Sequence, residues 1–227
     1  MIKNNLNNKA FGGLVFLVII LGLLLFLTAW SIYYWQAWVY LFLFFVSTGA
    51  ITLYLMKKDP ALLQRRMNAG PAAEKEKSQK IIQFIAQFSF LAVFLVPGFD
   101  HRFMWSNVPI YAVIAGDILV VAGFFIVFLV FKENTFTSAT IEVDREQKVI
   151  FTGPYALVRH PMYSGALLML FGTPVALGSW WGLLTFIPMA MVIVWRLFDE
   201  EKFLSKNLAG YTEYCIKVRW RLIPGIF

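Results

Sequence analysis

Residues 11–30 read FGGLVFLVIILGLLLFLTAW, an apolar stretch without a single charged side chain. A helix needs about 20 such residues to cross about 30 Å of hydrocarbon. The stretch is longer than the apolar core of a secretory signal, which has about 7–15 residues, and no small-x-small cleavage site follows it. We therefore predict a retained transmembrane helix at this position.

Five further apolar stretches follow the first. They comprise residues 35–56, 81–96, 108–131, 161–177 and 180–198. The third and the fifth of the six stretches are short, which is compatible with a tilted or a re-entrant segment. Only 15% of the residues are charged, compared with about 25% in soluble domains. The sequence predicts an all-α integral membrane protein with about six transmembrane helices, between five and seven.

Lysine and arginine side chains are concentrated in every second segment between these stretches. The other connections contain only Arg102. Because cytoplasmic loops carry the excess of basic residues, both termini are predicted in the cytoplasm, with the protein in the cell (inner) membrane. This bias and attraction to anionic membrane lipids account for the net charge of +7. No recognition motif indicates a nucleic-acid partner. The single cysteine, Cys215, excludes an internal disulfide, and no metal site is predicted.

The chain divides into N-terminal transmembrane helices, residues 1–131, and a candidate catalytic region, residues 132–227, within a single membrane domain. The loop after the second apolar stretch contains a possible short helix at 61–67, whose leucines could lie in the membrane interface, followed by the breaker Gly70-Pro71. Residues 132–160 are polar and contain β-forming residues between 141 and 150. This segment could admit a soluble cofactor or be a simple linker.

The first group of candidate residues lies in GPYALVRHPMYSG, residues 153–165. Pro161 suits the first position of a helix, and His160 stands where a cap would be. The positive end of such a helix can hold a carboxylate, and the rings of Tyr155 and Tyr163 could attract a cation. By itself, a His-Pro pair at a helix start is more often structural.

The second group lies in WRLFDEEKFL, residues 195–204, where Arg196 and Glu200 share one helical face. Ionisable groups at the end of a membrane helix are costly unless they are paired, reach the interface or are functional. A simple ion pair is an equally good explanation. The tail, residues 210–225, could form a lid, although its composition favours a membrane-surface segment. Asp117, inside a predicted span, could be functional or accept a hydrogen bond from a neighbouring helix.

Together, three elements resemble the isoprenylcysteine carboxyl methyltransferase family, whose members are membrane enzymes related to phospholipid methyltransferases. The elements, in order, are RHPxYxG from Arg159, RxxxEExxL from Arg196 and GYxxY from Gly210. The resemblance covers roughly residues 146–227, and the chain length is similar to that of the small prokaryotic members.

The resemblance implies a site for S-adenosylmethionine and a set of residues that contact it. These are Gln147, Lys148, Val149, Ile150, Tyr155, His160, Pro161, Met162, Tyr163, Glu200 and Glu201. It also implies catalytic roles for Arg196, which would bind the acceptor, and for Glu200. The implied reaction is O-methylation of the carboxylate of a lipid-soluble, isoprenylcysteine-like molecule that enters from the bilayer. The alternatives are N-methylation of a phospholipid or another amine, and a non-catalytic transport or scaffold protein.

Overall fold

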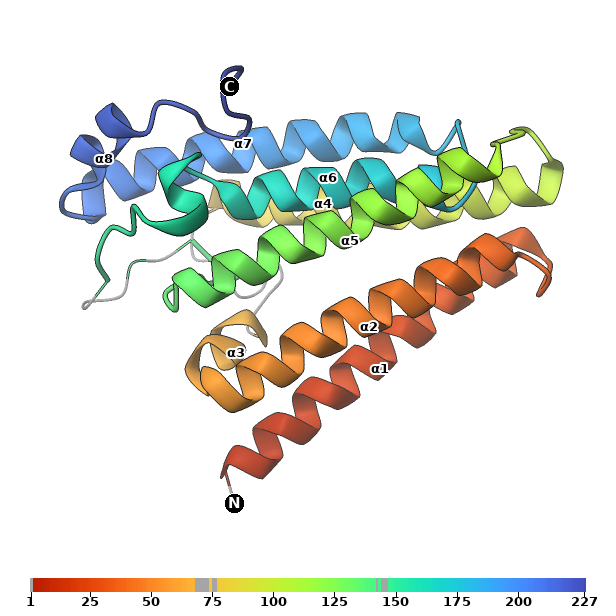
Figure 1. Ribbon diagram of the computed structural model, residues 1–227, viewed down its shortest axis with the longest axis horizontal. Coiled ribbons are helices and arrows are strands. Elements are labelled where there is room, and N and C mark those ends of the chain that lie inside the picture. Colours follow the sequence, from red (N-terminus) through yellow and green to blue (C-terminus); the bar gives the residue numbers. More distant parts are fainter. Residues whose placement is uncertain (1, 68–73, 75–76, 142, 144–146) are drawn as a thin grey trace.

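The computed structural model describes residues 2–67, 74, 77–141, 143 and 147–227, and it confirms the all-α class (Figure 1). Among these residues there is no strand, so the extended segment considered near residues 141–150 is not formed in the described part. The helices are α1 (Ile2–Ala29), α2 (Trp35–Lys58), α3 (Pro60–Met67), α4 (Lys77–Phe103), α5 (Ile110–Glu133), the 3-10 turn η1 (Gly153–Ala156), α6 (Pro161–Ala176), α7 (Leu183–Asn207) and α8 (Tyr211–Lys217).

Four of these helices are long and apolar enough to cross a membrane: α1 from Asn5 onward, α2, α4 and α5. Together they make the chain a membrane protein. The helix α6 has only 16 residues, and α7 has 25 residues but ends in a strongly charged segment. Both occupy the positions of predicted spans, but the total of six spans stays a prediction.

The helix α4 is longer than the sequence predicts, because it continues through Pro97 to Phe103. The apolar stretch predicted at residues 81–96 thus forms only part of this helix. Proline is tolerated inside membrane helices where neighbouring groups compensate for the missing hydrogen bond. Beyond it, Asp100 is 1% exposed and accepts hydrogen bonds from the hydroxyl groups of Ser106 and Ser179. The bond from Ser179 ties α4 to the connection between α6 and α7.

The helices α5 and α6 pack with their backbones in contact. A Cβ atom on Gly123 would lie 2.6 Å from the carbonyl oxygen of Gly165, and one on Gly116 would lie 2.3 Å from the backbone nitrogen of Ala176. Small residues allow this close approach between membrane helices. Asp117, on α5, is buried, and its Oδ1 has no hydrogen-bond partner within the part of the chain that the structure describes.

The short helix α3 begins after Asp59, whose carboxylate accepts a hydrogen bond of 2.9 Å from the backbone N–H of Leu62. Leu62 and Leu63 pack in a buried cluster with side chains of α1, α2 and α5, whereas Met67 is exposed. A position of these side chains in the membrane interface stays a prediction. The predicted breaker Gly70-Pro71 lies outside the described residues. Figure 1 shows α3, α8 and the connection between α5 and α6 at the same end of the molecule.

Candidate active site

A cavity of about 500 Å³ opens at this end of the molecule. Its lining comes from residues 134–141 and 147–150 of the connection between α5 and α6 and from α3 to α8, including Val127 of α5 and Ile193 of α7. Eleven of the twelve residues implied by the resemblance line it: Gln147, Lys148, Val149, Ile150, Tyr155, His160, Pro161, Met162, Tyr163, Arg196 and Glu200. The structure therefore brings these residues together, whereas their contacts with a cofactor remain a prediction.

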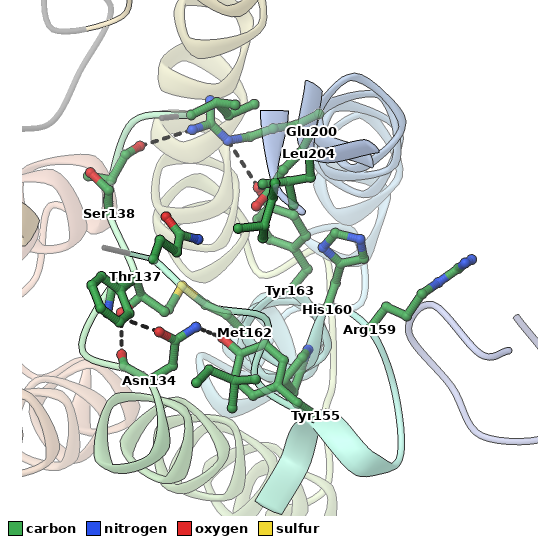
Figure 2. A pocket seen from close by; sticks show the side chains of 18 of the residues that line it. Asn134, Thr137, Ser138, Tyr155, Arg159, His160, Met162, Tyr163, Glu200 and Leu204 are labelled. Atoms are coloured by element: carbon green, nitrogen blue, oxygen red, sulfur yellow. Dashed lines mark hydrogen bonds between the residues drawn. The ribbon is translucent and has the colours of Figure 1, made fainter. Parts of the chain in front are cut away.

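The start of α6 lies at the centre of the cavity. Pro161 is the first helical residue, as expected, but the side chain of His160 makes no capping hydrogen bond. Its ring instead stacks on the ring of Tyr163, with 5.6 Å between the ring centroids. Figure 2 shows Met162, Tyr163, Glu200 and Leu204 around one space, with the side chain of Arg159 pointing away from them.

The hydroxyl group of Tyr163 connects α6 to the charged residues of α7. It donates a hydrogen bond of 2.5 Å to Glu200 Oε2 and accepts one of 3.1 Å from Arg196 Nε. Arg196 and Glu200, which share a helical face in the sequence, are thus joined through the hydroxyl group of a tyrosine. This arrangement fixes the ring of Tyr163 against the cavity.

The guanidinium group of Arg196 is almost fully engaged. Its Nη1 lies 2.8 Å from the carboxylate of Glu74 and 2.8 Å from Gln79 Oε1, and its Nη2 donates a hydrogen bond of 2.9 Å to the carbonyl group of Ala139. Glu74 is 3% exposed and also accepts hydrogen bonds from the side chain of Gln83 and the backbone of Ile141. Glu74 therefore joins α4, α7 and the loop of the cavity.

Glu201 does not line the cavity and instead contacts basic residues next to it. Its Oε1 lies 3.0 Å from Arg159 Nε and 3.3 Å from His160 Nε2, and its Oε2 lies 3.0 Å from Arg221 Nε. Burial by itself raises the pKa of Glu201. The hydrogen bonds from His160 and Arg221 and the adjacent positive charges outweigh burial, so the pKa lies below its usual value. The predicted contact of Glu201 with a cofactor stays untested.

The C-terminal tail is part of the site and not a simple surface segment. The backbone N–H groups of Arg159 and His160 donate to the carbonyl groups of Trp220 and Arg221, at 2.9 Å each. The helix α8 buries two tyrosines that line the cavity, and the hydroxyl group of Tyr214 donates a hydrogen bond of 2.8 Å to the carbonyl group of Tyr155. Burial raises the pKa of the phenol groups of Tyr155 and Tyr214, so both stay protonated at neutral pH.

Sequence reasoning missed several residues of this site. Arg66 and Gln83 line the cavity from the N-terminal half, Asn134 donates a hydrogen bond of 3.1 Å to the Tyr155 hydroxyl group, and Glu74 holds Arg196. The polarity of residues 132–140 was a signal for Asn134. Arg66 and Glu74 come from a segment whose many basic residues are equally expected from membrane orientation, and Gln83 lies within a predicted apolar stretch, so no local pattern distinguishes them.

Comparisons with known proteins agree with this region. Residues 111–210 match the family described as phospholipid methyltransferase. The protein-S-isoprenylcysteine O-methyltransferases B and A of Arabidopsis thaliana are 30% and 29% identical over 146 and 133 residues, which cover 61% and 56% of this chain. A probable protein-S-isoprenylcysteine O-methyltransferase of Oryza sativa subsp. indica is 30% identical over 136 residues, or 55% of the chain.

The matched stretch spans 66%, 63% and 64% of these three relatives, which is less than two thirds of their length. The family match at residues 111–210 contains the close pair α5 and α6, the start of α6 with His160, and the charged end of α7 with Glu200. The resemblance seen in the sequence motifs is thus confirmed by similarity over 55–61% of the chain. Over the region that these comparisons cover, the chain is similar to the phospholipid methyltransferase family and to protein-S-isoprenylcysteine O-methyltransferases.

Proposed function

We propose that this protein is an S-adenosylmethionine-dependent membrane methyltransferase that methylates a carboxylate of a lipid-soluble, isoprenylcysteine-like acceptor. The observation that carries the proposal is one cavity with two kinds of wall. Polar residues within 134–140 and 147–148 contribute a polar wall, whereas Val127, Ala166, Met169 and Ile193 contribute an apolar wall among α5, α6 and α7. A water-soluble cofactor from the cytoplasm and an acceptor with a hydrocarbon chain from the bilayer would meet there.

The side chains present suit the cofactor. The rings of Tyr155, Tyr163 and Tyr211 line the cavity, and the negative face of an aromatic ring attracts a cation. The carboxylate of Glu200 offers acceptors for amino or hydroxyl groups. When bound, S-adenosylmethionine supplies a methyl group on a positively charged sulfur, which is already an electrophile. The protein therefore needs no metal or nucleophile of its own for this reaction.

The contribution of the chain is to align the two reactants and to keep water out. Alignment of two bound reactants contributes roughly 7–11 kcal/mol to lowering the barrier. A carboxylate acceptor needs no general base. Arg196 was the residue implied to bind this carboxylate, but Glu74 already holds its Nη1. Arg196 would accept a substrate there only after Glu74 moves away, and in the observed arrangement it positions Tyr163.

Methylation of a lipid amine is the second candidate function, favoured by the family description of residues 111–210. An amine must lose a proton during the reaction, and Glu200, which faces the cavity, would serve as the base. The products differ in stability, because a methyl ester is cleaved by mild base whereas an N-methyl group is not. Release of the transferred label by base therefore separates the two functions.

Calorimetric titration of S-adenosylmethionine into the detergent-purified protein tests the cofactor site. We expect binding by the wild type, and binding weakened roughly tenfold or more by His160→Ala and by Glu200→Gln, because each removes a polar group from the lining. Glu213→Gln, on the exposed face of α8, is the control and should bind like the wild type. No binding at millimolar ligand by folded wild-type protein refutes the proposal and leaves a non-catalytic membrane protein.

A further inference from the structure

Arg66 belongs to a helix that the fold holds firmly against the transmembrane bundle. The helix α3 is capped by Asp59, and its residues Leu62 and Leu63 are 0% and 5% exposed. From this helix the side chain of Arg66 crosses the ring of Phe131, with 5.3 Å between the guanidinium carbon and the ring centroid. It then reaches the cavity, where Nη1 donates a hydrogen bond of 2.7 Å to the carbonyl group of Ser138.

Among the residues that the structure describes, three arginines contribute to the cavity lining, and they differ in their acidic partners. Arg159 is paired with Glu201 at 3.0 Å, and Arg196 is paired with Glu74 at 2.8 Å. Within the described ranges, no carboxylate lies within 4 Å of the guanidinium group of Arg66. Its neighbours there are a neutral carbonyl oxygen and an aromatic ring, which leave most of its N–H groups available to a ligand.

A buried arginine without a nearby acidic partner has a strong preference for an anion. Burial lowers the pKa of Arg66 because it removes water from the charged group. A guanidinium group presents five N–H donors in a planar fork, which matches the two oxygen atoms of a carboxylate. A carboxylate in the cavity would compensate the guanidinium group for the water that burial has removed.

We propose that Arg66 binds the carboxylate of a ligand in this cavity. The inference rests on the proposed methyltransferase function, in which two molecules bring a carboxylate. One is the amino-acid carboxylate of the cofactor, and the other is the carboxylate of the acceptor. Both present the same chemistry to Arg66. Arg196 is held by Glu74, so among the described arginines of the lining Arg66 is the one whose guanidinium group is open to a carboxylate.

Four probes separate the two sources by calorimetry. S-Adenosylhomocysteine carries the amino-acid carboxylate, and 5′-methylthioadenosine has the same nucleoside thioether without it. N-Acetyl-S-farnesyl-L-cysteine carries the acceptor carboxylate, and its carboxamide does not. The variants are Arg66→Gln, Arg66→Lys and, as a matched control, Arg65→Gln. Arg65 is the preceding residue of α3, bonds to the carbonyl group of Thr135 and does not line the cavity.

We expect Arg66→Gln to weaken one carboxylate probe roughly 10- to 100-fold, the range of a charge-assisted hydrogen-bonded contact. Its carboxylate-free analogue should change less than twofold. A selective effect on S-adenosylhomocysteine identifies the cofactor carboxylate, and one on the farnesylcysteine identifies the acceptor. Arg66→Lys should lie between, because it keeps the charge but not the fork, and Arg65→Gln should match the wild type.

Equal weakening of a carboxylate probe and its analogue would overturn the inference, because it would show a structural role for Arg66. Unchanged binding of both carboxylate probes by a folded Arg66→Gln variant would overturn it as well. Wild-type protein that binds S-adenosylhomocysteine but is insensitive to Arg66→Gln refutes only this inference. Wild-type protein that binds none of the four probes refutes the proposed function itself.

Discussion

Replacing Glu74 by glutamine tests whether this acid holds the site together. The carboxylate of Glu74 lies 2.8 Å from Arg196 Nη1, and the two side chains are 1% and 12% exposed. Removing one member of a buried ion pair costs about 3–5 kcal/mol, because the remaining charge is left without compensation. Arg196 keeps Gln79, Ala139 and Tyr163 as acceptors, which places the expected loss at the lower end, about 3 kcal/mol.

The assay is thermal unfolding in detergent, followed by tryptophan fluorescence. For a chain of this size, 1 kcal/mol corresponds to about 2–4 °C in Tm, so Glu74→Gln should lower Tm by about 6–12 °C. Glu213→Gln makes the same chemical change on an exposed surface and should leave Tm within about 1–2 °C, because surface substitutions typically cost within about 0.5 kcal/mol.

A double-mutant cycle with Arg196→Met shows whether the effect passes through the pair. Residues in direct contact are coupled by about 0.5–3 kcal/mol, whereas independent residues give additive effects. We expect coupling of about 2 kcal/mol between Glu74 and Arg196, given their distance and burial. Additive effects, or a Tm for Glu74→Gln equal to that of the Glu213→Gln control, would refute the reasoning.

Two further predictions concern the frame of the site. Gly123→Ala should lower Tm by the equivalent of about 1–3 kcal/mol, because its Cβ would lie 2.6 Å from the carbonyl oxygen of Gly165; Gly12→Ala, with no atom within 4 Å of its Cβ, is the control and should not lower Tm. The lowered pKa of Glu201 adds stability that is present above the usual value of 4.5 and is lost as the pH falls through the lower, folded value. Thermal unfolding between about pH 6 and 3 should therefore show a steeper acid-side loss for the wild type than for Glu201→Gln, and parallel curves would contradict this.

The fold could be predicted from hydropathy wherever the burial of apolar side chains in lipid is the dominant driving force. The stretch at residues 11–30 is apolar on every side, so its burial in lipid dictates a helix whatever it packs against. The end of α4 was not predictable in this way. Pro97 normally interrupts a helix, and the end of α4 that follows it is held by a contact with a residue distant in the sequence, the hydrogen bond from Ser179 to Asp100.

In the candidate site, too, some residues could be predicted from the sequence and others could not. His160, Tyr163 and Glu200 lie in short motifs whose spacing places them at helix ends, and the structure brings them together around one cavity. Glu74 and Arg66 precede α4 in the sequence, and tertiary packing alone brings them to this site. Local patterns carry no information about such contacts, because a charged residue in a loop is equally compatible with exposure to water.

The acids around the cavity, more than its arginines, determine where an anionic ligand can bind. Arg196 occupies the motif position, yet it makes contacts of 3.1 Å or less with Glu74, Gln79, Ala139 and Tyr163. A ligand would have to displace a buried carboxylate to reach its Nη1 atom, at the cost of leaving that carboxylate unpaired. Arg66 imposes no such cost, because the bond from its Nη1 is to a neutral carbonyl group. An anion that enters the cavity therefore gains more from Arg66 than from the arginine that the sequence motif singles out.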